Sequence, residues 1–317
     1  MTDIKRLGLG CMGMSCRRNP ENSVKTIRKA LDCGVTLFNT GEFYSSGESE
    51  MIVGEALREI PRDSFFLSVK FGVLPQPGGG IYGLDVEPFH IKGHLAYSLS
   101  RLGMDYVDLY QPARQDTEIP VEEVVGEISR LVEAGYVRNI GLSMVDAETL
   151  RRAHKVHPIH TVEMSYSLID RSIEKELIET ARELNVKVLA FGTIGHGLFA
   201  DNVLERDEND PRAARGMLSP EHRAVNLPML KALKEIADEK GMSLSQLALA
   251  WSLAKYENMQ SLVGTTDPEH LQSAVDALNF ELSKEDIERI EKAIPADKIS
   301  GRGMRNFRFT NGKMTLA

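Results

Sequence analysis

A lysine and a tyrosine stand near the ends of two neighbouring predicted strands, and together they could carry acid–base chemistry. Lys70 lies inside the otherwise apolar run 65–71, where a charged side chain needs a specific role. Tyr44 comes shortly after the preceding strand, which ends at Asn39. A free phenol titrates at about 10, and a nearby ammonium lowers that pKa because it stabilises the phenolate. The pair therefore indicates a general acid, although loop packing for Tyr44 and a surface position for Lys70 would explain the same residues.

The elements that must hold this pair follow a repeating pattern. Short apolar runs alternate with segments of helical periodicity, and near-continuous apolarity is typical of parallel strands buried on both faces. Eight strands are predicted, at residues 7–14, 35–39, 65–71, 106–110, 139–143, 160–166, 186–191 and 260–265. Helices with clear apolar faces are predicted within residues 121–132 and 173–184.

Four predicted junctions between a helix and the next strand contain a residue that tolerates the left-handed conformation, namely Gly34, Gly103, Gly135 and Asn185. Eight strands that alternate with helices favour a closed (β/α)8 TIM barrel, whose catalytic face is formed by the loops that follow the strands. We expect one such domain over residues 1–317, with long loops at this face.

Three segments interrupt the alternation of strands and helices. Residues 75–80 are predicted to form a flexible loop rich in Pro and Gly, and residues 193–226 a long polar connection. The basic segment 301–308 in the tail has no strong periodicity. Long loops inside a compact domain are usually functional or disordered, so the two loops that follow strands are expected at the catalytic face.

An open dinucleotide-binding sheet is the rival fold, because residues 8–13 match the pattern G-x-G-x-x-G. That fingerprint requires a helix to open within the motif, so that its N-terminus faces a pyrophosphate. Here the first helix signals come only at Pro20 and Glu21. The next strand ends at Asn39, where the fingerprint would place an acid. The barrel is therefore favoured over the open sheet.

Composition excludes several classes of protein. The chain has 317 residues and a net charge of −8 without a basic run, which argues against nucleic acid as a partner. No apolar stretch reaches the roughly 20 residues of a membrane span, and residues 1–6 lack the apolar core of a secretory signal. Three cysteines do not suggest a disulfide framework. We expect a cytoplasmic protein, and no sequence feature predicts its oligomeric state.

The sequence resembles the aldo-keto reductase family over nearly its whole length. The resemblance rests on five segments in the expected order, at residues 34–50, 69–70, 108–110, 140–143 and 263–271. It implies a (β/α)8 barrel that reduces a small aldehyde or ketone with a nicotinamide cofactor, NADPH in preference to NADH, and that uses no metal. The histidines at 154, 157 and 160 are accordingly not expected to bind one.

The resemblance assigns catalytic roles to Tyr44 as proton donor and to Lys70 as its electrostatic partner. Two positions depart from the family pattern, because Asn39 stands where the family has Asp and Ala113 where it has His. Asn39 can hydrogen-bond Lys70 but cannot compensate its charge. Ala113 removes a side-chain donor for the substrate carbonyl and is expected to open space in the substrate pocket.

A narrower resemblance, to the pyridoxal reductase branch, accounts for both departures. It rests on residues 39–44, 113–116 and 162–168, and that branch carries Asn and Ala at the two altered positions. Its substrate has a phenolic oxygen next to the aldehyde. We hypothesise that a hydrogen bond within the substrate partly replaces the missing histidine.

The cofactor residues are implied by the resemblance as well. Ser143 and Glu163 correspond to residues that hold the nicotinamide carboxamide, with Glu163 at a position that is more often Gln, and Phe191 corresponds to the aromatic that stacks on the nicotinamide ring. The remaining candidates are Gly10, Met12, Gly13 and Asn39 beside the cofactor, Gly192, Thr193, Ile194, Gly195 and Gly197 at the pyrophosphate, and Gly264, Thr265, Thr266 and His270 at the adenosine end. His270 takes the place of an arginine that would bind the 2′-phosphate.

Two other functions remain open from the sequence. A cofactor-binding sensor or scaffold with weak turnover would explain the changes at Asn39 and Ala113. An unrelated barrel hydrolase is less consistent with the chain, since neither metal ligands nor a placed pair of carboxylates is evident.

Overall fold

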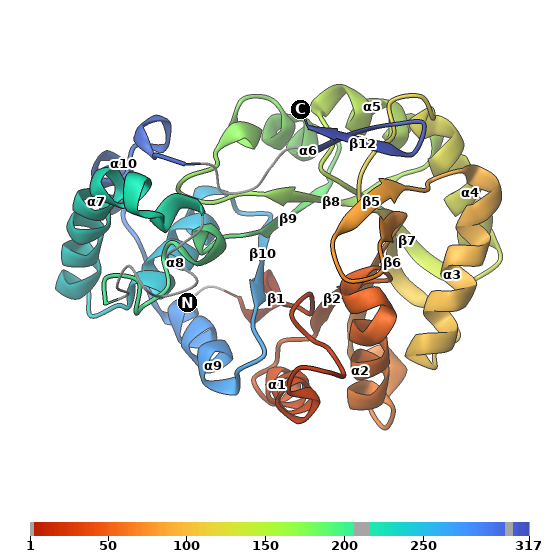
Figure 1. Cartoon of the computed structure of the whole chain (residues 1–317), viewed down its shortest axis with the longest axis horizontal. Helices are drawn as coiled ribbons and strands as arrows, with labels where there is room; N and C mark the ends of the chain where they lie inside the picture. Colours follow the sequence, from red (N-terminus) through yellow and green to blue (C-terminus); the bar gives the residue numbers. More distant parts are fainter. Residues whose placement is uncertain (1–2, 206–215, 302–306, 317) are drawn as a thin grey trace.

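Eight parallel strands close into a barrel in the computed structural model of the chain (Figure 1), which describes residues 3–205, 216–301 and 307–316. Around the barrel the strand order is β1-β10-β9-β8-β7-β6-β3-β2. The strands are β1 (Leu7–Gly10), β2 (Leu37–Gly41), β3 (Phe66–Phe71), β6 (Val107–Pro112), β7 (Val137–Ser143), β8 (Ile159–Ser165), β9 (Lys187–Phe191) and β10 (Met259–Gly264). Each overlaps one of the eight predicted runs, so the predicted barrel is confirmed.

Helices surround the barrel on its outer side (Figure 1). They are α1 (Pro20–Asp32), α2 (Glu48–Leu57), α3 (Pro88–Leu102), α4 (Val121–Glu133), α5 (Ala147–Val156), α6 (Leu177–Glu183), α7 (Pro220–Glu239), α8 (Leu244–Lys255), α9 (Pro268–Asp276) and α10 (Lys284–Ala293). The helix predicted within 121–132 is confirmed as α4. The one predicted within 173–184 is shorter than expected, because Glu176 has non-helical dihedral angles and separates α6 from a 3₁₀ turn at Ser172–Glu174.

The predicted junctions have the backbone geometry that their residue types indicate. Gly34, Gly103, Gly135 and Asn185 all have positive φ, at 83°, 65°, 82° and 55°. The G-x-G-x-x-G motif does not open a helix, since α1 begins only at Pro20. Short left-handed turns therefore return the chain from each of these helices to the barrel, and the open-sheet alternative is excluded.

Apolar side chains fill one layer of the barrel interior. Leu37, Leu189 and Leu262 form a buried cluster there, and Phe66 packs against it. The cluster requires a glycine on β1, because a Cβ atom at Gly8 would lie 2.7 Å from Leu37 Cδ2.

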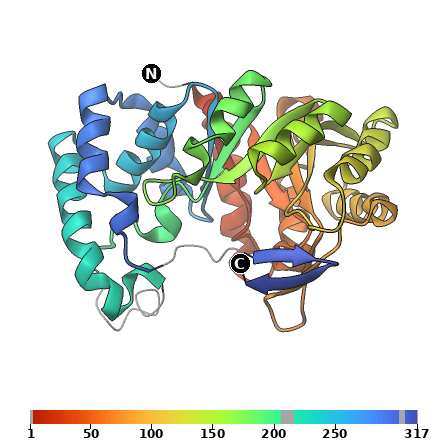
Figure 2. The same cartoon turned by 90° about the horizontal axis from the view of Figure 1, so that it is seen from above.

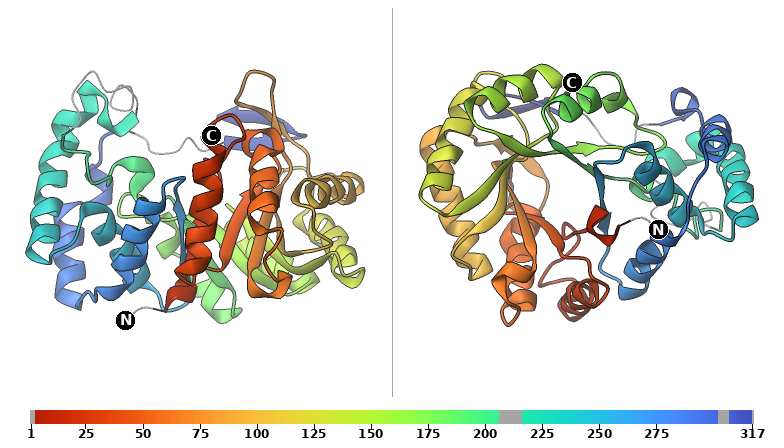
Figure 3. Two further views of the ribbon diagram at one scale, coloured as in Figure 1. Left: turned by 90° about the horizontal axis from the view of Figure 1, so that it is seen from below. Right: turned by 180° about the vertical axis from the view of Figure 1, so that it is seen from behind.

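A small antiparallel sheet lies beside the carboxyl ends of the barrel strands (Figures 2 and 3). It has the order β11-β12-β5-β4, formed by β4 (Val73–Pro75), β5 (Ile81–Leu84), β11 (Phe307–Thr310) and β12 (Lys313–Leu316). The expectation of a flexible loop at 75–80 is therefore incomplete, because this segment is the tip of the β4–β5 hairpin. The basic tail segment reaches into β11, although residues 302–306 lie outside the described part.

The described parts of the long connection after β9 contain helical elements. They include a 3₁₀ turn at Gly195–Gly197, and α7 already begins at Pro220. Met217 and Leu218, which precede α7, are buried in the core. Residues 206–215 of this connection lie outside the described part.

All three cysteines of the chain, Cys11, Cys16 and Cys33, are free. Among the helices in the described ranges, none combines the length and the apolarity needed to cross a membrane.

One buried carboxylate joins the small sheet to the barrel. Asp116, in the loop between β6 and α4, is 1% exposed. Its two oxygens accept hydrogen bonds from the amides of Asn311, at 3.0 Å, and Gly312, at 2.7 Å, in the turn of the C-terminal hairpin. Oδ1 also accepts from the amide of Glu118, at 2.9 Å. The hairpin is thus held at the loop that follows β6.

We predict that Asp116→Ala loosens this hairpin. Loss of the carboxylate leaves partly buried backbone amides without an acceptor. Each amide that water cannot reach should then cost about 1–3 kcal/mol of stability. Hydrogen exchange of the β11 and β12 amides should therefore accelerate by about tenfold or more. Asp116→Asn, which keeps one acceptor oxygen, should have an intermediate effect, and α8 amides serve as the internal control. Unchanged exchange in Asp116→Ala would mean that pairing with β5 holds the hairpin by itself.

Candidate active site

A buried lysine is the centre of the polar group inside the barrel. Lys70, on β3, is 3% exposed. Its Nζ lies 3.0 Å from Glu163 Oε1 on β8, and it also donates a hydrogen bond to Asn39 Oδ1 on β2. The expectation that the charge of Lys70 lacks compensation is therefore wrong. The partner is far away along the chain, since two barrel strands, β6 and β7, lie between the strand of Lys70 and that of Glu163.

Amide side chains hold the carboxylate of Glu163 from two directions. Glu163 Oε2 accepts from Asn39 Nδ2 at 2.7 Å and from Gln111 Nε2 at 2.6 Å. The same two amide groups donate to Ser68 Oγ, at 3.1 Å and 3.2 Å. We refer to Asn39, Ser68, Lys70, Gln111 and Glu163 as the Lys70 cluster. Its members come from four strands and are all buried, so the cluster fixes the carboxylate and the ammonium in one arrangement.

Sequence reasoning did not single out Ser68 and Gln111. The available signal was a polar residue within an apolar strand, the same signal that marked Lys70. Gln111 also depends on a glycine of β7, because a Cβ atom at Gly141 would lie 2.8 Å from Gln111 Oε1. The motif residue Gly141 thus has a steric role next to the cluster.

Tyr44 lies next to this cluster, as its position in the sequence predicted. It is half-buried in a turn, Tyr44–Gly47, that directly follows β2. The centroid of its ring is 5.2 Å from Lys70 Nζ. Ser45 and Ser46 both have left-handed backbone, with φ of 49° and 54°, a costly conformation for residues other than glycine. This strained turn directs the tyrosine toward the barrel interior.

The ionisation of the pair differs in part from the expectation. Burial raises the pKa of Tyr44, and although the Lys70 charge lowers it as expected, the pKa remains above its ordinary value. Burial lowers the pKa of Lys70, but Glu163 and Tyr44 together raise it more, so that this pKa is also elevated. At neutral pH the phenol is protonated and the ammonium is charged. The predicted depression of the Tyr44 pKa is wrong, yet the proton needed by a general acid is in place.

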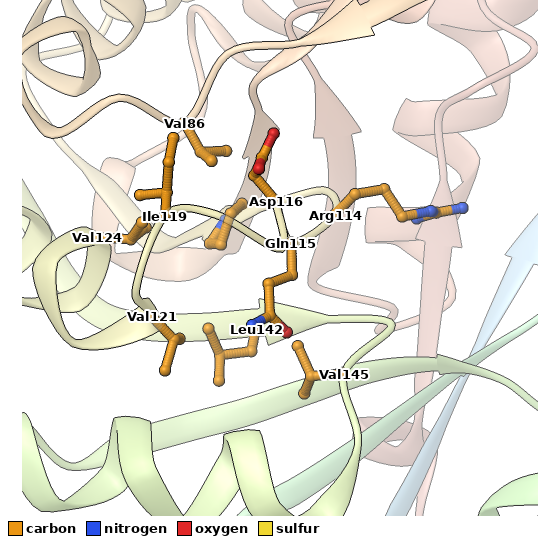
Figure 4. Close-up of a pocket in the computed structure, with 10 residues that line it drawn as sticks. Val86, Arg114, Gln115, Asp116, Ile119, Val121, Val124, Leu142 and Val145 are labelled. Carbon is orange, nitrogen blue, oxygen red and sulfur yellow. The ribbon is translucent and has the colours of Figure 1, made fainter. Parts of the chain in front are cut away.

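Ala113 and Arg114 follow β6 at the mouth of the barrel. Ala113 is 1% exposed and donates its amide to Phe71 O at 2.9 Å. Arg114 is half-buried and points away from the apolar wall formed by Val86 and Ile119 (Figure 4). Its charge lowers the pKa of Tyr44. Arg114 is therefore the residue beside Ala113 that is available to a ligand.

The residues expected around a nicotinamide lie together at the ends of β7, β8 and β9. Ser143 pairs in register with Glu163, and its buried Oγ has no hydrogen-bond partner in the described part of the chain. Phe191, which ends β9, is half-buried. The Phe191 ring packs against the apolar cluster of Leu37, Leu189 and Leu262. A buried hydroxyl without a partner beside a carboxylate suits a polar ligand group such as a carboxamide.

The loop after β9 has the glycine-rich geometry expected of a phosphate-binding turn. Gly192, Gly195 and Gly197 have positive φ, at 71°, 60° and 92°. Two of its amides are used within the loop, since Gly195 N donates to Gly192 O and Gly197 N to Ile194 O. Thr193 is buried between these turns. Any pyrophosphate contact would therefore depend on the other amides of the loop.

The expected adenosine site after β10 contains little positive charge. Thr265 Oγ1 is engaged locally, because it accepts from Asp267 N at 3.0 Å. Asp267 caps α9 through the amide of Glu269, so two acids occupy the helix start. His270 is exposed in the first turn of α9. The side chains left for a phosphate are those of Thr266 and His270.

The end of β1 supplies the last cofactor candidates. Gly10 ends the strand, Gly13 is exposed in the following loop, and the side chain of Met12 is 67% exposed. An exposed methionine near the mouth of the barrel can cover an extended ligand.

The histidines at positions 154, 157 and 160 make separate contacts. His154 Nδ1 accepts from Ile159 N, whereas His160 stacks on Phe66 with ring centroids 5.6 Å apart. Burial lowers the pKa of His160 to about 4. Over residues 3–205, 216–301 and 307–316, no group of three or more His, Cys, Asp or Glu side chains is arranged to hold a metal ion.

A closed (β/α)8 barrel with an ionisable cluster at the carboxyl ends of its strands has the architecture of a barrel enzyme. The sequence matches the model of the Aldo/keto reductase family over residues 6–295. The probable aldo-keto reductase 1 of Glycine max is 34% identical over 309 residues, which cover 94% of this chain and 88% of the relative. The chain therefore belongs to the aldo/keto reductase family, whose members are NAD(P)H-dependent oxidoreductases that act on small carbonyl compounds.

Solved structures agree with this membership. The glycerol dehydrogenase AKR11B4 from Gluconobacter oxydans has a TM-score of 0.83 and 25% identity, over 95% of this chain and 94% of its own. An aldo-keto reductase from Klebsiella pneumoniae, solved in complex with NADPH, has a TM-score of 0.72 and 24% identity, over 94% and 95% of the two chains. Both likenesses extend over nearly the whole of each chain.

We predict that Gly141→Ala disturbs the Lys70 cluster. The added methyl would collide with Gln111 and displace its amide from Glu163, which should destabilise the fold by about 1–3 kcal/mol. Urea unfolding measures the change. Gly126→Ala is the matched control, because Gly126 lies in α4 with no neighbouring atom within 4 Å of an added Cβ. That control should stabilise by up to about 1 kcal/mol, and equal effects of the two substitutions would contradict the steric role of Gly141.

Proposed function

We propose that this protein reduces an aldehyde or ketone to an alcohol with NADPH, and that Tyr44 donates the proton with the assistance of Lys70. The observation that carries the proposal is the position of Tyr44, whose ring centroid is 5.2 Å from Lys70 Nζ at the mouth of the barrel. Burial raises the pKa of Tyr44, in keeping with a phenol that holds its proton. A developing alkoxide would gain both a proton donor and a fixed positive charge at this point. Family membership supports the same reaction.

The residues present fit a nicotinamide cofactor, which when bound supplies the hydride. The unpartnered Oγ of Ser143 and the carboxylate of Glu163 can hold its carboxamide, and Phe191 can stack on its ring. Asn39, next to Glu163, orients that carboxylate. We propose NADPH in preference to NADH because the K. pneumoniae relative was solved with NADPH. Thr266 and His270 would then contact the 2′-phosphate.

We predict that Tyr44→Phe lowers kcat by about 10²- to 10⁴-fold, because the proton donor is removed. Binding of NADPH, measured by quenching of nicotinamide fluorescence, should change little, since the phenol does not hold the cofactor. Turnover should be followed by nicotinamide absorbance with NADPH and NADH and a panel of aldehydes that includes pyridoxal.

Tyr110→Phe is the matched control for this variant. Tyr110 is fully buried and its hydroxyl has no partner among the described residues, so the loss of that oxygen should leave turnover unchanged. A wild-type protein that binds NADPH but reduces none of the aldehydes would favour the alternative of a redox sensor or scaffold.

We further propose that the substrate is an aromatic aldehyde with a hydroxyl next to the carbonyl, as in pyridoxal. Ala113 supplies no donor for the carbonyl oxygen, whereas such a hydroxyl can donate to it within the substrate and still accept a hydrogen bond. Arg114 is available as the donor, because its guanidinium makes one hydrogen bond, to Ala113 O at 2.6 Å, and has no acidic partner in the described ranges. This cation lies near Tyr44 and is partly withdrawn from water, which lowers its pKa.

We predict that kcat/KM for pyridoxal exceeds that for an analogue without the phenolic hydroxyl, by about tenfold or more if one charge-assisted hydrogen bond is involved. Arg114→Met should reduce this ratio, and Arg114→Lys, which keeps the charge, should retain part of it. Equal kcat/KM for the two compounds in the wild-type protein would refute this choice of substrate but would leave carbonyl reduction by Tyr44 intact.

A further inference from the structure

We infer that Glu163, a residue of β8, supplies the carboxylate that holds and neutralises the Lys70 ammonium, while Asn39 on β2 supplies the amide. The inference assigns Glu163 a positioning role toward the Tyr44–Lys70 pair, beyond its expected contact with a nicotinamide carboxamide. It rests on the proposed function for its catalytic meaning, but the pairing itself can be tested without turnover.

The contacts of Lys70 identify its counter-ion. Within the described ranges, Glu163 is the acid that forms an ion pair with Lys70, with Nζ at 3.0 Å from Oε1 and 3.3 Å from Oε2. Both side chains are almost fully buried, at 4% and 3% side-chain exposure. A charge so far removed from water requires a compensating charge, and Asn39 brings none. Glu163 is therefore essential to keep Lys70 charged.

The orientation of Glu163 is fixed by donors rather than by chance packing. Its Oε2 receives the amides of Asn39 and Gln111 in addition to Lys70, whereas Oε1 contacts Lys70 Nζ at 3.0 Å and keeps a second lone pair. Ser143, beside it in register, is the other polar group at this edge. The carboxylate can thus face Lys70 with both oxygens while it retains an acceptor for a ligand amide.

The two departures from the family pattern at positions 39 and 163 support the same pairing. The resemblance placed an amide-type change at Asn39 and a carboxylate at Glu163, where the family has Asp and more often Gln. In the folded chain these two side chains contact each other, with Asn39 Nδ2 at 2.7 Å from Glu163 Oε2. The two changes therefore compensate, since together they leave one carboxylate and one amide around the ammonium.

The other charged and titratable groups around Lys70 define the sign of the effect. Tyr44 and the thiol of Cys11 face it, burial raises the pKa of Cys11 to about 12, and Arg114 acts on Tyr44. Glu163 raises the pKa of both Lys70 and Tyr44. Removal of its negative charge must lower both pKa values, so the active protonation state should be lost at lower pH, whichever group loses the proton.

The decisive experiment is a charge-exchange cycle of Glu163→Gln, Asn39→Asp and the double variant, assayed as kcat/KM against pH. The wild-type protein should show no alkaline loss from these groups below about pH 10. In Glu163→Gln the alkaline limb, which is the pH at which kcat/KM falls on the alkaline side of the profile, should lie at least about one pH unit lower than in the wild-type protein. The double variant, which restores one carboxylate beside Lys70, should return the limb toward the wild-type position. Loss of a nicotinamide contact alone would not move this limb.

Two controls separate this effect from general damage to the fold. Glu163→Asp keeps a carboxylate and should retain the wild-type limb even if kcat falls. Glu50→Gln removes a different buried carboxylate, which pairs with Arg101 outside the Lys70 cluster, and should leave the limb unchanged.

A second measurement does not depend on catalysis. In protein labelled with ¹³C-lysine, the Lys70 Cε resonance, assigned by its absence in Lys70→Met, should titrate at lower pH in Glu163→Gln and recover in the double variant. A coincident titration in wild type and Glu163→Gln would overturn the inference, as would a double variant no better than Glu163→Gln. If the wild-type protein reduces no aldehyde, the proposed function fails, while this titration still decides the role of Glu163.

Discussion

A buried ammonium is the constraint on which the active-site end of this barrel depends. Lys70 sits 3% exposed among apolar strands, and a charge in that position is tolerated only if a carboxylate and hydrogen-bond acceptors surround it. Glu163 supplies the charge, and Asn39 and Gln111 hold it in place. Their strands must therefore keep a fixed register, because a slip of one residue would turn these side chains out of the barrel. The geometry of the Lys70 cluster and the register of the barrel strands therefore depend on each other.

The loops around the mouth of the barrel are also held by a buried polar group and by a constrained backbone turn. Asp116 ties the C-terminal hairpin to the loop after β6, and that loop also carries Arg114. The strained Ser45–Ser46 backbone holds Tyr44 over Lys70. Tyr44 and Arg114, the residues proposed to face the substrate, thus lie on short connections that follow barrel strands and not within the apolar core.

Much of the fold could be read from local patterns. The apolar runs predicted every barrel strand, and the junction residues such as Gly34 and Asn185 predicted the left-handed turns, because both depend on the residue and its near neighbours. The β4–β5 hairpin and its partner at the C-terminus were missed. Their strands are short, and their pairing joins segments far apart in the chain, so no local periodicity announces it. The break before α6 likewise depends on the backbone at Glu176.

The sequence by itself determined the barrel, the presence of a tyrosine and a lysine on adjacent strand ends, and the family to which they point. Only the tertiary structure decided which residue neutralises the Lys70 charge. It also decided whether burial or the neighbouring charge has the larger effect on the pKa of Tyr44. Pattern and propensity act between neighbours along the chain, whereas electrostatic compensation acts through space. Residues 39, 70, 111 and 163 acquire a common chemistry only when four separate strands bring them within hydrogen-bond distance.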